Sequence, residues 1–167
     1  MRGVANLKHQ HDNLHMGVAA MAVTRARFAE LDRDTMADAI AEILEFFRKD
    51  VAPHARAEES VLYPEVARLL NVHLSDMLVH EHRKMDRLVA DLIEAQGALA
   101  MGSEAPSNVA AVFDALVSLM RSHLRQEEEV LLTMLEEHLT AAEADDLYGR
   151  MRQATSQAIA AASTTTL

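Results

Sequence analysis

The chain has 167 residues, half of them apolar, and its formal net charge is −10. This length allows one hydrophobic core, and the acidic excess argues against nucleic acid or an anionic membrane as partner. The absence of cysteine excludes disulfides, thiolate catalysis and iron–sulfur clusters. No apolar run approaches the ~20 residues needed to span a bilayer, and no apolar leader follows Met1-Arg2, so we expect a cytoplasmic protein.

The first half of the chain predicts two long helices. Good helix formers dominate the composition, and the whole chain holds only three Pro and five Gly. The first helix should cover about residues 4–29, because apolar residues recur there at three- and four-residue spacing. The segment from Asp32 supplies N-cap residues for a second helix over about 35–70. Pro53 and Pro64 should kink this helix, because proline lacks an N–H and clashes with the preceding turn.

The second half predicts two further long helices and a shorter one. The third helix should cover about residues 76–100 and the fourth about 108–138, separated by a Gly- and Ser-containing loop. Thr140 and Glu143 match a capping box that opens a fifth helix, which should end near Ala161.

These elements predict an all-α fold, an up-down-up-down four-helix bundle with an additional short C-terminal helix. We expect the bundle to occupy residues 1–139, the extra helix 140–162 and a frayed tail 163–167. The extra helix either covers the bundle or mediates dimerisation, and its composition favours neither.

Two sequence patterns recur between the halves of the chain. The segment His9-Gln10-His11 in the first helix matches His80-Glu81-His82 in the third. The pattern His-x3-Glu occurs in both the second and the fourth helix, and this spacing places both side chains on one helical face. An antiparallel bundle would bring all four elements to one central point. The candidate ligands of a metal site are therefore His11, His54, Glu58, His82, His123 and Glu127.

This set of side chains favours a centre with two metal ions. Two buried carboxylates are costly unless they are paired or bound to metal. Imidazole with carboxylate suits Fe, Zn, Mn or Ni, whereas the lack of thiolate argues against a structural zinc site. Six ligands are too many for one tetrahedral ion but suit two ions that share bridging carboxylates. Both ions would keep open positions for water or a small diatomic molecule.

The chain resembles the hemerythrin-like (HHE cation-binding) domain family from about Leu7 to Leu139. The motifs that carry the resemblance are Gln10-His11-Asp12-x-Leu14, His54-x3-Glu58-Glu59-x2-Leu62-Tyr63-Pro64, Glu81-His82-Arg83-x-Met85 and His123-x3-Glu127-Glu128-x2-Leu131. The resemblance implies a bundle around a non-haem centre of two iron ions with an oxo or hydroxo bridge. It also implies four histidines as terminal ligands, with Glu58 and Glu127 as bridges.

The chain departs from the oxygen-carrying hemerythrins on its third helix. Those proteins have His-x3-His there, whereas Leu78 stands four residues before His82 and Asp86 four residues after it. One imidazole is thus missing, which argues against simple reversible O2 carriage. His15, one turn after His11, is a candidate for the missing ligand. Tyr63 is expected to pack in the core beside the Pro64 kink, with an approach of its hydroxyl to the metals as the alternative.

Three functions remain open from the sequence. The first is a di-iron protein that binds or senses O2, NO or iron itself. The second is a di-iron enzyme that decomposes hydrogen peroxide. The third is a metal-free helical interaction module, in which the His and Glu side chains only cap and solvate helices. A homodimer or an unknown protein partner fits any of them. Glu59, Glu128 and Glu129 are expected to be solvated or to lie just outside the ligands.

Overall fold

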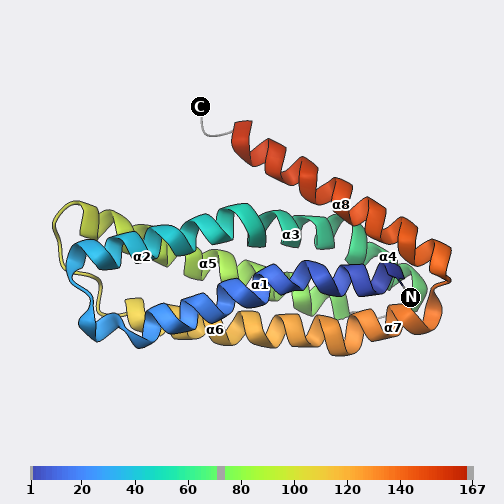
Figure 1. Ribbon diagram of the computed structural model, residues 1–167, viewed down its shortest axis with the longest axis horizontal. Coiled ribbons are helices and arrows are strands. Elements are labelled where there is room, and N and C mark those ends of the chain that lie inside the picture. The colour runs from blue at the N-terminus through green and yellow to red at the C-terminus, as the bar shows by residue number, and fades with distance from the viewer. Residues whose placement is uncertain (1, 71–73, 165–167) are drawn as a thin grey trace.

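The computed structural model describes residues 2–70 and 74–164, and it confirms the all-α, hemerythrin-like helical bundle (Figure 1). Four helical arms alternate in direction, and α8 crosses them obliquely at one end. The segments in chain order are α1 (Arg2–Ala26), η1 (Phe28–Glu30), α2 (Arg33–Phe46), η2 (Phe47–Val51), α3 (Ala52–Ala57), η3 (Glu58–Leu62), α4 (Tyr63–Leu70), α5 (Leu74–Ala100), α6 (Val109–Gln126), η4 (Glu127–Leu131), α7 (Leu132–His138) and α8 (Ala141–Thr164). Residues 165–167 of the expected tail lie outside the described residues.

The predicted helix starts have the expected caps. The Asp32 carboxylate accepts a hydrogen bond of 2.8 Å from the backbone N–H of Thr35 at the start of α2. Thr140 and Glu143 form the reciprocal bonds of a capping box before α8. Gly102 follows α5 with a φ of +81°, a conformation that glycine adopts at no steric cost. Local sequence signals therefore set the ends of these helices.

The expected kinks take the form of wide π-helical turns. η2 and η3 are single π turns. η2 precedes Pro53, whereas η3 begins at the buried Glu58, and the Tyr63 N–H bonds to the Glu58 carbonyl five residues earlier. The η4 turn begins in the same way at Glu127 but has no proline. Proline alone therefore does not explain the widening, because two of the three π turns begin at the buried glutamates.

A polar layer divides the core into two apolar clusters. One cluster fills the end near the α1–α2 and α5–α6 connections and includes Ile40, Phe113 and Met120. The other fills the end beneath α8 and includes Leu78 and Leu147. Among the described residues, the buried polar or charged side chains are the six candidates for the metal site, His11, His54, Glu58, His82, His123 and Glu127.

The α8 helix lies along the groove between α1 and α3, beside this polar layer (Figure 1). Its buried residues Ala144, Leu147 and Met151 belong to the nearer apolar cluster. Gly3 lies so close to the Ala144 backbone that a Cβ atom at this position would overlap it. The absent side chain at Gly3 therefore allows α8 to pack against α1.

Replacing Gly3 with Ala should loosen α8 and lower the free energy of unfolding by about 1–3 kcal/mol, as is typical of overpacking. Gly97→Ala is the matched control, because a Cβ there meets no atom within 4 Å. That change should stabilise α5 by up to ~1 kcal/mol. Urea unfolding, with amide exchange of α8, measures both variants; equal stability of the two would contradict the close approach.

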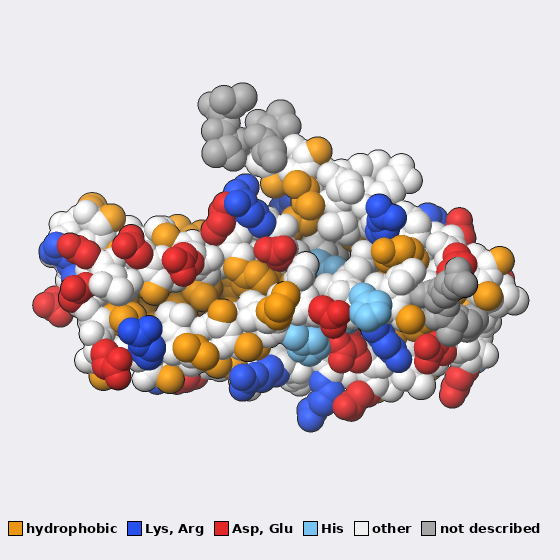
Figure 2. Space-filling view, in the orientation of Figure 1, with side chains coloured by type: hydrophobic (Ala, Val, Ile, Leu, Met, Phe, Trp, Pro, Cys, Tyr) orange, Lys and Arg blue, Asp and Glu red, His pale blue; other side chains and the backbone are white. Residues whose placement is uncertain are grey.

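The visible face of the molecule mixes acidic and basic side chains, with histidines gathered along α1 (Figure 2). Within the described residues, every helix is too short or too polar to cross a bilayer.

Candidate metal centre

Six side chains from six segments converge in the polar layer. The histidines project from α1, α3, α5 and α6, and each glutamate is the first residue of a π turn. None of the six is more than 7% exposed. Because each lies on the inward face of its helix, the predicted spacing brings them together.

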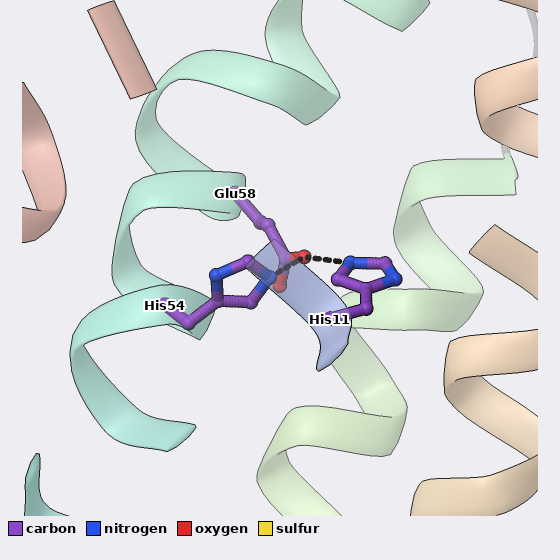
Figure 3. Close-up of side chains that lie close together, drawn as sticks. All are labelled: His11, His54 and Glu58. Carbon is purple, nitrogen blue, oxygen red and sulfur yellow. Dashed lines mark ion pairs between the residues drawn. The ribbon is translucent and has the colours of Figure 1, made fainter. Parts of the chain in front are cut away.

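Glu58 lies between two pairs of histidines. Its Oε1 is 2.8 Å from His54 Nε2 and 3.8 Å from His11 Nε2, as Figure 3 shows. Its Oε2 is 3.4 Å from His82 Nε2, which is 3.0 Å from His123 Nε2. Two potential sets of metal ligands result, His11–His54–Glu58 and Glu58–His82–His123. Glu58 belongs to both sets, as a bridging carboxylate would.

Glu127 occupies the opposite side of the same layer. Its Oε2 lies 3.5 Å from His11 Nε2, and its Oε1 lies 3.6 Å from His123 Nε2. The Tyr63 hydroxyl donates a hydrogen bond of 2.6 Å to Glu127 Oε1 and lies 3.4 Å from His82 Nε2. Tyr63 therefore reaches the centre and is not only a packing residue.

Three buried atoms in this layer have no hydrogen-bond partner: His54 Nε2, Glu58 Oε1 and Glu127 Oε2. The first two lie 2.8 Å apart without the orientation of a hydrogen bond. Leaving a buried polar atom unpaired costs about 1–3 kcal/mol. A cation among them would accept lone pairs from all three, so the donor set fits a metal ion.

Carboxylates hold the outward nitrogens of three histidines. His11 Nδ1 lies 3.0 Å from Glu128, His82 Nδ1 lies 2.8 Å from Glu59, and His123 Nδ1 lies 2.9 Å from Glu81. A proton on each Nδ1 leaves the inward Nε2 free to bind a metal. This arrangement orients the imidazoles as metal-binding histidines are usually oriented.

The two buried carboxyl groups differ in their protonation. Burial favours the neutral form of Glu58, but His54, His11 and His82 outweigh it and hold its pKa well below the usual value. Burial and the Glu58 charge together raise the pKa of Glu127 well above the usual value. Of the two buried carboxyl groups, Glu58 therefore favours the charged form and Glu127 the neutral form.

The pKa values of His82 and His123 shift in opposite directions. Burial opposes a charge on His82, but Glu58 and Glu59 outweigh this and raise its pKa. Burial and the charge of His82 lower the pKa of His123. The Nε2 atoms of the two rings lie 3.0 Å apart. Two imidazole nitrogens this close together can bind the same metal ion.

His15 does not reach the buried layer, contrary to its candidacy as the missing ligand. Its Nε2 lies 2.8 Å from Glu128 Oε1, and 46% of its side chain is exposed. His9 and His80 are exposed, as expected from their helical faces, and the predicted loop residue His73 lies outside the described residues. The sequence interpretation missed Glu81 as the partner of His123. Glu81 directly precedes His82, as Gln10 directly precedes His11, and this repeated position is the sequence signal for Glu81.

Comparison with known proteins agrees with a metal site in a helical bundle. The model of the hemerythrin HHE cation-binding domain matches residues 2–75 and 73–164. The chain belongs to the hemerythrin family of HHE cation-binding domains. The two matched segments meet near the α4–α5 connection, where the sequence repeat also divides the chain. This hemerythrin-like protein is thus a metal-binding helical protein with a cluster of His and Glu in its core.

A DNA nickase of Nostoc sp. (strain PCC 7120 / SAG 25.82 / UTEX 2576) is 29% identical to this hemerythrin-like chain over 118 residues. The match covers 71% of this chain but only 32% of the Nostoc protein. No solved structure is significantly similar to the chain.

Proposed function

We propose that this hemerythrin-like protein holds two iron ions in the polar layer and uses them to bind or sense a small ligand, O2, NO or iron itself. The observation that carries the proposal is the shared position of Glu58 in two sets of buried ligands. His11 and His54 would hold one ion, and His82 and His123 the other. Glu127 would act as the second bridge after losing its proton.

Iron suits this donor set because imidazole and carboxylate favour first-row metals over calcium or magnesium, and no thiolate is present. Ferrous ions supply electrons and open positions for a small ligand. The chain supplies a cavity of about 20 Å³ bordered by Glu58, His82, His123 and Glu127. In the metal-free protein that volume holds about one water molecule, and it lies where the proposed ligands would place the ions.

Peroxide decomposition is the second candidate, and one contact favours it. Tyr63 donates a hydrogen bond to Glu127, and the pKa of each group is raised beside the centre, which favours their protonated forms. A peroxide bond that is broken needs protons for the departing oxygen. Tyr63 and Glu127 are placed to provide them.

A small molecule is the proposed ligand in either case, with the cytoplasm as the proposed location. The net charge of −10 would repel the phosphates of DNA, so we do not extend the nicking activity of the Nostoc relative to this chain. A homodimer or a protein partner for signalling remains part of the sensing hypothesis.

Anaerobic loading with ferrous iron followed by addition of NO, O2 or peroxide tests the proposal. Binding or sensing predicts a spectral change that saturates at a fixed number of ligand molecules per iron pair. The peroxide enzyme instead predicts continued O2 release, which Tyr63→Phe should slow about tenfold or more, since positioned proton donors contribute 10²–10⁴-fold. Tyr148→Phe is the matched control, because Tyr148 lies on α8 against Arg152. Absence of any spectral change with loaded iron would overturn both functions.

A further inference from the structure

An apolar cavity of about 270 Å³ opens between the second helical arm and α5, outside the polar layer. It is lined by apolar side chains, including Phe47, Ala52, Val89 and Ile93. The charged residues that border it, Arg48 and Asp86, are exposed, so their charged groups lie in solvent. The interior of the cavity is therefore a poor environment for an ion, which would lose its hydration there without gaining a partner.

This cavity adjoins the small space at the candidate metal centre. The 20 Å³ space among the metal-site residues shares four lining residues with the outer cavity, Val51, Ala55, His82 and Met85. These side chains border both volumes. Ala55 has a single methyl group, and Met85 has a flexible side chain with three rotatable bonds, so the boundary between the volumes includes a small residue and an adaptable one.

A different cavity reaches the centre from the side of α8. Its volume is about 180 Å³, and its lining mixes Gln10, Asn13, Lys49, Asp50 and Thr155 with His54. Polar side chains there can replace the hydration of water and small ions, which the apolar cavity does not do. The two approaches therefore differ in the chemistry of what they admit.

We propose that the apolar cavity is the passage by which small uncharged molecules of diatomic size reach the metal centre, with Val51, Ala55 and Met85 as its inner gate. The inference rests on the proposed function for the arrival of a ligand at iron. The presence of the cavity itself does not depend on any metal. The outer volume admits and concentrates an apolar molecule beside His82, which also lines the metal-site space.

Ala52→Phe tests the passage, because Ala52 lines the outer cavity and not the metal-site space. With ferrous iron loaded, we expect the rate of NO association to fall about tenfold while iron content stays unchanged, since the polar cavity on the side of α8 is the poorer path for an uncharged molecule. Val89→Phe fills the cavity from the facing helix and should give the same result if Ala52→Phe does not fold. Ala90→Phe, at an exposed position of α5 that lines neither cavity, should bind NO at the original rate.

Xenon binding to the metal-free protein supplies a readout that needs no iron. Xenon should perturb the methyl resonances of Ala52 and Met85 in the original chain, and the effect on Met85 should be lost in Ala52→Phe. Failure of the proposed function would appear as absent iron uptake with the xenon effect intact. The passage is overturned if xenon leaves these methyl groups unchanged, or if Thr155→Phe, in the polar cavity, slows NO more than Ala52→Phe does.

Discussion

Replacing Glu58 with Gln should empty both metal positions and lower the iron content from about two ions per chain to less than about 0.2. Glu58 belongs to both ligand sets, and its carboxylate is within 3.8 Å of three imidazoles. The amide keeps the shape of the side chain but removes the negative charge that binds the cations. Loss of outer carboxylate partners costs 10–100-fold in affinity, so loss of a shared ligand should cost more.

Glu129→Gln is the matched control for this experiment. It makes the same change of charge at an exposed residue two positions after Glu127, and it should retain full iron content. Circular dichroism establishes whether both variants are folded, because removing one partner of a buried charged group can cost about 3–5 kcal/mol. Elemental analysis measures the iron content of each variant. If Glu58→Gln binds as much iron as the original chain, Glu58 is not a shared ligand.

Removing metal with a chelator should lower the unfolding temperature by about 8–16 °C. A ligand at a thousandfold excess over its dissociation constant stabilises the native state by about 4 kcal/mol, and each kcal/mol corresponds to about 2–4 °C for a chain of this size. The structural reason is the polar layer between the two apolar clusters, in which three buried atoms lack partners. Metal satisfies these atoms, and its removal leaves them unpaired.

The Glu58→Gln protein serves as the control for chelation, because its unfolding temperature should not respond to chelator. Differential scanning calorimetry of the two proteins, before and after chelation, gives the comparison. Equal unfolding temperatures for the iron-loaded and chelated original chain would instead favour the metal-free interaction module.

The bundle could be predicted from the sequence because helical periodicity and helix caps depend on residues that are close together in the chain. The stripe of Leu7, His11, Leu14, Val18 and Met21 on the first helix follows from helical geometry, and all five are buried. The caps at Asp32 and Thr140 likewise depend only on neighbouring residues. Whether the six buried His and Glu ligate metal stays a prediction, although the structure brings them into one layer.

Other features depend on contacts between distant segments, which helical periodicity does not specify. The bond from His123 to Glu81 joins two helices, and the spacing on either helix does not reveal it. The same holds for the contact of His15 with Glu128, which also joins two distant segments. The position of α8 between α1 and α3 depends on a close approach at Gly3 that composition does not indicate.

Iron content and the absorption spectrum after anaerobic loading with ferrous iron and exposure to air test the two-metal centre most directly. The shared position of Glu58 predicts about two irons per chain, with near-ultraviolet bands of an oxo- or hydroxo-bridged pair. One zinc ion, or no bound metal after loading, would contradict it.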